Sequence, residues 1–280
     1  LESAARELGK TTQFSASQAA EAMAFFAQAG FDSTKIIEAM PATLNLAAAG
    51  QLEMGQAADI VAKIMGGMGL EAAELGNTVD ILAKAFTTSN TDLVQLGDAM
   101  KFVGPVAKIA GKDMSETVAV LQTMAQAGLQ GGLAGTAFRG ILAKLAGNGK
   151  EVSSVFGFLG VKIKDVDGNL RNTADIVEDF NRALGEKGVE SADAMGMAIK
   201  AFGLRAGPWF TALLEKGAGT IRDFESALDD VGGTADNIAK VQMDTLTGSF
   251  KKMWSQISES AIKIGGIFMP MIERMAAGIE

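Results

Sequence analysis

The sequence predicts an all-α protein, because helical spacing of apolar residues recurs from end to end and strand-like alternation is confined to one short segment. A second observation is that several apolar runs stop at a glycine, which ends a helix at little conformational cost; the 280 residues include 34 glycines and only four prolines. The pattern of helix, glycine stop, apolar contact and next helix predicts antiparallel helical hairpins. These would pack as a bundle or a short solenoid, because such hairpins cannot bury their apolar faces singly.

The first helix is predicted from Ser15, which forms a capping box with Gln18, to a stop at Gly30. A run over 56–65 ends at Gly66 and Gly67, and it predicts the first helix of a further hairpin. The partner helices of this region are expected over 33–49, bent or broken at Pro41, and over 71–86.

A second capping box, Asp113 to Glu116, opens a helix over 117–127 that stops at Gly128. The sequence Ala-Gln-Ala-Gly precedes both this stop and the stop at Gly30, and an apolar residue follows in each case. A helix over 133–146 completes the N-terminal set. The expected helices of the second set lie over 173–184, with a stop at Gly185, and over 191–202, 208–214 and 219–229.

One segment, 161–172, breaks the helical pattern. Apolar and polar residues alternate from Val161 to Val166, and Asp167-Gly168 is a favoured pair for a tight turn. The sequence therefore predicts a small β-hairpin here. It separates the predicted domains, which are an N-terminal helical-hairpin block at 1–150, a β-hairpin with a second helical block at 151–232, and a long C-terminal helix leading to coil at 233–280.

The C-terminal helix carries apolar residues that recur at intervals of eleven, which is 3.67 residues per turn. A stripe of this length is expected to pack on a partner helix, and the sequence predicts a homo-oligomer formed through it. The stretch 264–272 is too short to span a bilayer. The predicted partner-packing residues are Phe250, Met253, Ile257, Ala261, Ile264, Phe268, Ile272 and Met275.

The composition excludes several kinds of chemistry. The chain has no histidine, cysteine or tyrosine, so it can form no Ser-His-Asp triad, Cys-His pair, zinc finger or disulfide. The net charge of −8 and the lack of a basic stripe predict no direct nucleic-acid binding. We expect no catalytic residues, no metal and no cofactor.

Three motifs that could carry chemistry are better explained structurally. Counted from Asp165, the acidic turn lacks the glycine and the bidentate acid of an EF-hand. The glycine-rich segment 128–135 follows a helix and lacks the lysine of a P-loop. Two carboxylate pairs, Glu71 with Glu74 and Asp229 with Asp230, suit solvated helix faces.

Several blocks of sequence, in order, carry a family resemblance. They cover nearly the whole chain from about residue 17 to 275. The blocks are AEAMAFFAQAGF at 20–31, AMPATLNLAAAG at 39–50, AADI at 57–60, LGDAMKFVGPVA at 96–107, AGTAFR at 134–139, DVDGNL at 165–170 and LTGSFK at 246–251. Together they resemble the conserved core region of phage tail tape measure proteins.

The resemblance implies a structural role. Proteins of this family occupy the tail lumen and set tail length while tube subunits polymerise around them. They are kept soluble by tail assembly chaperones and engage the baseplate or tail-tip hub. At infection they leave the tail and assist genome delivery across the cell envelope, where the host inner membrane becomes a further partner.

The start at Leu1, without a signal peptide pattern, leads us to expect a segment of a longer protein whose parent chain carries a membrane helix. The glycine stops predict a compact module within that tape. Two alternatives stay open. One is a prophage-encoded lytic or membrane-active, pore-forming effector, which would need a carboxylate pair facing a sugar-sized cleft. The other is a cellular helical-repeat adaptor with one exposed groove for a peptide.

Overall fold

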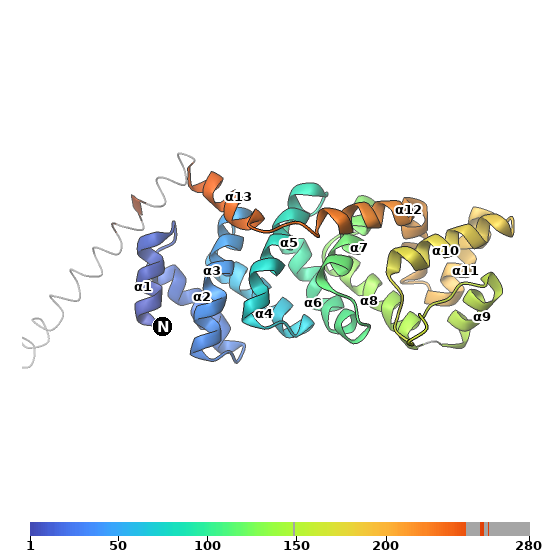
Figure 1. Cartoon of the computed structure of the whole chain (residues 1–280), viewed down its shortest axis with the longest axis horizontal. Coiled ribbons are helices and arrows are strands. Elements are labelled where there is room, and N and C mark those ends of the chain that lie inside the picture. Colours follow the sequence, from blue (N-terminus) through green and yellow to red (C-terminus); the bar gives the residue numbers. More distant parts are fainter. Residues whose placement is uncertain (148, 245–252, 255–256, 258–280) are drawn as a thin grey trace, which may run out of the picture. The chain divides into compact units, whose positions relative to one another are not determined.

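The computed structural model describes residues 1–147, 149–244, 253–254 and 257. Within them the secondary structure is helical apart from one isolated bridge, which confirms the all-α prediction (Figure 1). The helices in chain order are α1 (Glu2–Thr11), α2 (Ala16–Gln28), α3 (Ser33–Gly50), α4 (Met54–Met68), the 3₁₀ turn η1 (Ala72–Glu74), α5 (Leu75–Thr88), α6 (Leu93–Ile109), α7 (Met114–Gln126), α8 (Gly131–Gly147), α9 (Lys150–Leu159), α10 (Thr173–Glu186), α11 (Ser191–Phe202), α12 (Gly207–Ala227) and α13 (Thr234–Met243).

The chain forms two compact units. Among the described residues, unit 1 comprises 1–62 and those from 235 onward, and unit 2 comprises those within 63–234. The three-part division predicted from the sequence stays a prediction, since much of its third part lies outside the described residues.

In unit 1, α1 packs against α2, and α2 packs against α3. The predicted capping box opens α2: Ser15 Oγ accepts from the Gln18 amide at 3.2 Å, and Gln18 Oε1 accepts from the Ser15 amide at 2.9 Å. The turn between α1 and α2 is tight, because a Cβ on Gly9 would lie 2.6 Å from the backbone nitrogen of Ala16. The Gln51 side chain donates to Gln242 Oε1 at 2.9 Å and ties α13 to the end of α3.

Unit 2 is centred on α7. Its residues from Glu116 to Ala125 are all buried, so this helix is enclosed on every side rather than on one amphipathic face. It packs against α5, α6, α8 and α12. Its buried hydroxyls are satisfied locally, since Thr117 and Thr123 donate to the carbonyls of Asp113 and Ala119, four residues earlier.

The other end of unit 2 is held by a cluster of four phenylalanines. Each ring comes from a different helix, α9 to α12, and all four are buried. Ring centroids lie 4.5 to 6.4 Å apart in edge-to-face and tilted arrangements, which are favourable for aromatic quadrupoles. The cluster consists of Phe156, Phe180, Phe202 and Phe210.

Many helices end in the same hydrogen-bond pattern, the Schellman motif. At the end of α2, the Phe31 amide donates to the Phe26 carbonyl and the Gly30 amide to the Ala27 carbonyl. Gly30 and Gly128 have φ of +89° and +88°, which confirms the two predicted stops. The same six-residue bond closes α3, α4, α6, α7, α9 and α10.

Two predicted glycine stops are wrong. α4 continues through Gly67 and ends at Met68, with the left-handed residue at Gly69. Gly67 instead allows a close approach to α6, where Pro105 Cδ would lie 3.3 Å from an added Cβ. The helix α10 likewise passes Gly185 and ends before Gly188, whose φ is +63°.

Other boundaries also differ. α3 runs unbroken through Pro41. The two helices predicted over 208–214 and 219–229 are both present within α12, which is interrupted between them by the non-helical residue Gly217 (φ +82°, ψ 158°), so the predicted break is confirmed. Three helices, α1, α6 and α9, were not predicted; they are respectively strongly polar, interrupted by Pro105, and short.

The predicted β-hairpin is present only as a reversed turn with one antiparallel bridge, Lys164 to Leu170. The Arg171 amide donates to the Ile163 carbonyl at 3.0 Å. A longer ladder does not form because the Leu170 and Arg171 carbonyls accept from a lysine ammonium and Asn172 already caps α10.

The close approach of α8 to α6 at Gly135 gives a test of the packing. An added Cβ on Gly135 would lie 2.1 Å from the Ala99 carbonyl oxygen, so Gly135→Ala forces two backbones apart and should cost about 1–3 kcal/mol. The matched control is Gly196→Ala in the exposed middle of α11, where nothing lies within 4 Å. That change should stabilise by about 0.5–1 kcal/mol. Urea unfolding of both variants checks this; equal effects would contradict the packing.

Candidate functional site

The predicted partner-packing stripe is described at two positions. Met253 and Ile257 have helical backbone and expose 49% and 51% of their surface, and the neighbouring Trp254 exposes 69%. Large apolar side chains this open are available to a partner. The other predicted residues of the stripe lie outside the described residues, namely Phe250, Ala261, Ile264, Phe268, Ile272 and Met275. The stripe therefore stays a prediction.

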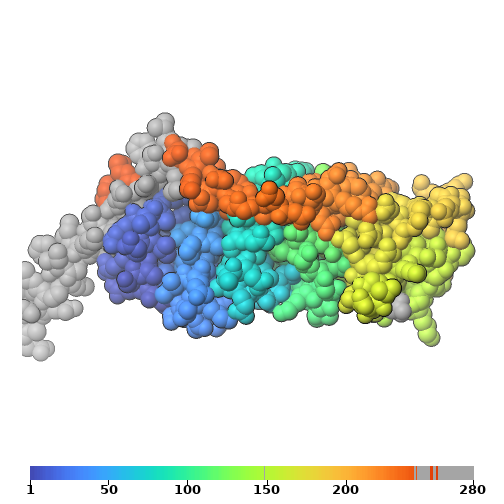
Figure 2. Space-filling view, viewed as in Figure 1, coloured from blue at the N-terminus to red at the C-terminus, as the bar shows by residue number. Residues whose placement is uncertain are grey.

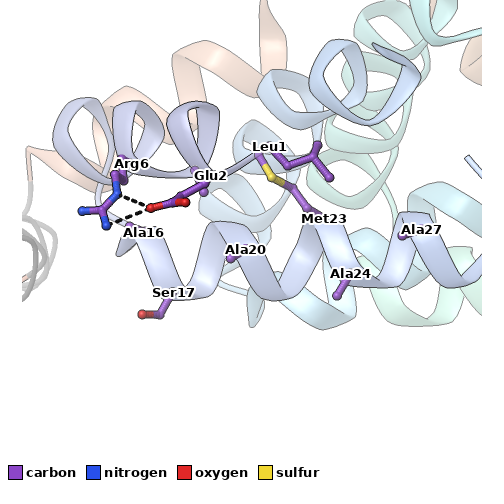
Figure 3. A pocket seen from close by; sticks show the side chains of 10 residues that line it. Leu1, Glu2, Arg6, Ala16, Ser17, Ala20, Met23, Ala24 and Ala27 are labelled. Carbon is purple, nitrogen blue, oxygen red and sulfur yellow. Dashed lines mark hydrogen bonds and ion pairs between the residues drawn. The ribbon is translucent and has the colours of Figure 1, made fainter. Parts of the chain in front are cut away.

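An apolar hollow of about 430 Å³ lies between α1 and α2 (Figure 3). Its wall on α2 consists mainly of small residues, and the Met23 side chain lies beside Leu1. On α1, Arg6 donates to Glu2 Oε1 at 3.0 Å, so these charges pair with each other at the edge of the hollow. Its chemistry suits an apolar side chain and offers no group for catalysis. The lining is Leu1, Glu2, Ala5, Arg6, Ala16, Ser17, Ala20, Met23, Ala24 and Ala27.

A second hollow, of about 470 Å³, lies in unit 2 and is lined by two carboxylates, Glu74 and Asp113. Both are engaged in capping. Glu74 Oε2 accepts from the Glu71 amide at 2.8 Å, and Asp113 Oδ1 accepts from the Glu116 amide at 2.8 Å. Carboxylates held by backbone amides in this way stabilise helix starts. The predicted acidic pair Glu71 and Glu74 thus caps η1.

The main polar feature of unit 2 is a buried ion pair between Lys112 and Glu116, with Nζ and Oε1 3.0 Å apart. Lys112 Nζ also donates to the Leu170 and Arg171 carbonyls at 3.1 and 2.5 Å. Glu116 Oε1 accepts from the amide and hydroxyl of Thr173, both at 2.7 Å. All three ammonium donors are therefore used, and the pair fastens the turn at 165–173 to the start of α7.

This geometry corrects the second predicted capping box. Asp113 caps α7 as expected, since its side chain accepts from the Glu116 amide. The Glu116 carboxylate does not return to the Asp113 amide, because it bonds to Thr173 and Lys112 instead. Sequence reasoning missed Lys112 and Thr173. The one available signal was the spacing of four between Lys112 and Glu116, although Lys112 lies just before α7 and the pair therefore forms across the start of that helix.

A further carboxylate, Glu225 on α12, lies beside this pair. Its Oε1 accepts from Asn172 Nδ2 at 2.8 Å. Burial raises the pKa of Glu225, and the negative charges of Glu116, Asp113 and Asp229 raise it further, against the lowering effect of the Asn172 bond. The contact between α12 and α7 thus carries carboxylates on both sides.

The acidic turn forms a closed arrangement of its own. Asp165 Oδ1 accepts from the Asp167 and Asn169 amides at 2.9 and 2.8 Å, and the bond to the Asn169 amide lowers the pKa of Asp165. Among the residues that the structure describes, no group of three acidic side chains is placed to hold a metal ion. In the same residues, no helix combines the length and the hydropathy needed to cross a membrane.

The buried pair makes a sharp stability prediction. Glu116→Gln leaves the Lys112 ammonium buried without a counter-charge, so unfolding should become easier by about 3–5 kcal/mol. Glu7→Gln is the control, because Glu7 pairs with Lys10 on the surface and should change stability by less than about 1 kcal/mol. Urea denaturation followed by circular dichroism measures both. If Glu116→Gln lowers the free energy of unfolding by less than about 1 kcal/mol, the ion pair does not have the structural role assigned to it.

Glu225 predicts a pH dependence. Because its pKa is raised in the folded state, its stabilising contribution is full below the ordinary glutamate pKa and is lost as pH rises through the raised value. Glu225→Gln retains an oxygen to accept from Asn172 and cannot ionise. The variant should be more stable than the native chain at pH 7, by less than about 1 kcal/mol given its partial exposure, and equally stable near pH 4.

Urea midpoints at the two pH values test this. The control is Glu186→Gln, which removes a carboxylate from the exposed surface of α10 and should not reproduce the gain in stability expected of Glu225→Gln at pH 7. Carboxylates with a lowered pKa, such as Asp179 beside Arg171, make stability change with pH in the opposite direction. They are present in both the native chain and the variant, so their effect cancels in the comparison. A larger stabilisation at pH 4 than at pH 7 would reverse the assigned sign.

Comparison with known proteins identifies relatives of the chain. A family model described as "Phage-related minor tail protein" matches residues 2–203. The chain is 29% identical over 279 residues to the "Tape measure protein" of Pneumococcus phage Dp-1, an alignment that takes in 100% of this chain and 24% of that protein. It is 28% identical over 256 residues to the "Probable tape measure protein" of Escherichia phage P2, covering 91% and 31%. The chain thus spans about a quarter to a third of these relatives. No solved structure matches.

Proposed function

The chain belongs to the phage-related minor tail proteins, and from this premise we propose that it is a folded, non-enzymatic segment of a tail tape measure protein. In this role the parent chain lies in the tail lumen and sets tail length while the tube polymerises. It then leaves the tail at infection to assist genome delivery across the cell envelope. The observation that supports this most is the family match over 2–203 together with the two similarities to tape measure proteins.

The fold supports a particular place for this segment within the tape. As one continuous helix, 280 residues would reach about 420 Å at 1.5 Å per residue. The helix ends at Gly30, Gly128 and Gly188 turn the chain back instead. Each of the two units is compact in itself. We therefore assign the segment to a compact module, with measuring length supplied by other parts of the tape.

The proposed partners follow from this role. They are the tail tube protein, a tail assembly chaperone, and baseplate or tail-tip hub proteins, with the host inner membrane as a partner after ejection. A second copy of the chain is a further proposed partner through the C-terminal stripe, supported by the openness of Met253, Trp254 and Ile257.

Tail length offers a direct test. An in-frame deletion of unit 2 (63–234) from the parent gene should shorten the tail by far less than the roughly 260 Å that the same residues would span as one helix. A control deletion of equal length, taken from a long uninterrupted helical part of the parent chain, should shorten the tail by about 1.5 Å per residue. Electron microscopy of tails gives both lengths.

The two arms fail separately. If the control deletion leaves tail length unchanged, the tape measure role is lost. If the unit 2 deletion shortens the tail by the full helical length, the segment acts as an extended ruler and the compact reading is wrong.

A further inference from the structure

The second half of α12 and the residues after it form a distinct covering segment, which we call the strap and define as 218–234. In Figure 2 the orange surface of unit 2 includes this segment, which runs over the green residues of α7. We infer that the strap is detachable: it opens as one piece while α5 to α11 stay folded. This inference rests on the proposed function. It adds to that function the first step by which the folded module begins to extend.

The strap has its own small set of anchors. Five of its own apolar side chains are buried: Ala218, Ile221, Phe224, Leu228 and Val231. At its end the Gly233 amide donates to Asp80 Oδ2 on α5 at 2.8 Å, a contact between residues 153 positions apart. These contacts hold the strap against helices from much earlier in the sequence.

A hinge separates the strap from the rest of α12. Gly217 has φ +82° and ψ 158°, which interrupts the helix, and a glycine adopts this conformation without a Cβ penalty. The half before the hinge is held independently. Phe210 belongs to the aromatic cluster, and Asn181 Nδ2 donates to the Leu214 carbonyl at 2.7 Å. The first half can therefore stay docked on α10 and α11 while the strap moves.

Negative charges on the strap and at the start of α7 weaken the contact between them. Glu225 of the strap lies near Asp113 and Glu116 at the start of α7, and like charges at such a contact oppose docking, while Glu225 Oε1 accepts one hydrogen bond from Asn172 at 2.8 Å. The Lys112 ammonium is already paired with Glu116. One surface arginine of the strap, Arg222, offsets this by pairing with Asp175 and Glu178 on α10 at 2.7 and 2.6 Å.

The direction of the chain gives the strap its role. A pull, or a partner, acting on the residues after Thr234 first frees α13 from its contact with Gln51 and then reaches the Gly233 to Asp80 bond at the end of the strap. Once this bond is lost, the strap leaves as one piece about Gly217. The apolar face of α7 is uncovered at the end of this process, while the aromatic cluster remains closed.

Native-state hydrogen exchange on the whole 280-residue chain tests the strap. We expect the amides of 218–227 to exchange as a group at least tenfold faster than those of α7 and α8, with a weaker dependence on added urea than global unfolding. This measurement needs no variant. Exchange of 218–227 at the same rate and with the same urea dependence as α7 would overturn the proposal.

A pair of variants adds a local test. Asp80→Ala should speed exchange of the strap at least threefold and leave α9 to α11 unchanged, while Asp80→Asn, which keeps an acceptor oxygen, should change it less. Asp98→Ala, on the exposed face of α6, is the matched control and should leave the strap unaffected. A uniform rise in exchange over the whole of unit 2 in Asp80→Ala would also overturn it. Neither result depends on tail length, so the proposed function is tested separately.

Discussion

The backbone hydrogen bond that closes the helix ends is the interaction on which the rest of the structure depends. In each Schellman motif an amide reaches back to the carbonyl five residues earlier, so the chain leaves the helix in a fixed direction. At most of these ends the residue that makes this bond is apolar, such as Phe31 or Leu129, and it is turned back toward the helix it leaves; at the end of α6 it is Lys112. Because the bond recurs at several helix ends, the path of the chain is set locally, before any long-range contact is made.

This local origin explains why part of the fold can be predicted from the sequence. The capping box at Ser15 and the stops at Gly30 and Gly128 depend on residues within six positions of each other, and the structure confirms them. Gly67 shows the limit. A glycine that admits a neighbouring helix and a glycine that ends one look alike in sequence, and only the position of Pro105 distinguishes them.

The candidate site was less predictable for the same reason. Lys112 and Glu116 are four residues apart, but their partners, Leu170, Arg171 and Thr173, lie more than 50 positions further along the chain. No local sequence pattern predicts partners that lie so far along the chain. The predicted stripe at Met253 and Ile257 is the opposite case, since its periodicity is plain in the sequence and its partner is a matter for experiment.

The polar groups buried in unit 2 share one use. Lys112, Glu116 and Thr173 hold a turn to a helix, and Gln122 Nε2 joins α7 to Ala85 and Thr88 of α5. Lys112 and Glu116 each bond to groups within unit 2, so these interactions stabilise the fold of the unit. Buried polar groups that are paired in this way make a fold more rigid.

The late position of α12 in the chain has a consequence for biosynthesis. α7 is complete at Gln126, whereas the helix that covers it ends at Ala227, about 100 residues later. At about 5 to 20 residues per second, ribosomes need roughly 5 to 20 s to make this stretch. During that interval the nascent chain carries a helix whose residues 116–125 are destined for burial but lack their cover, so each new molecule passes through an aggregation-prone state before it can close.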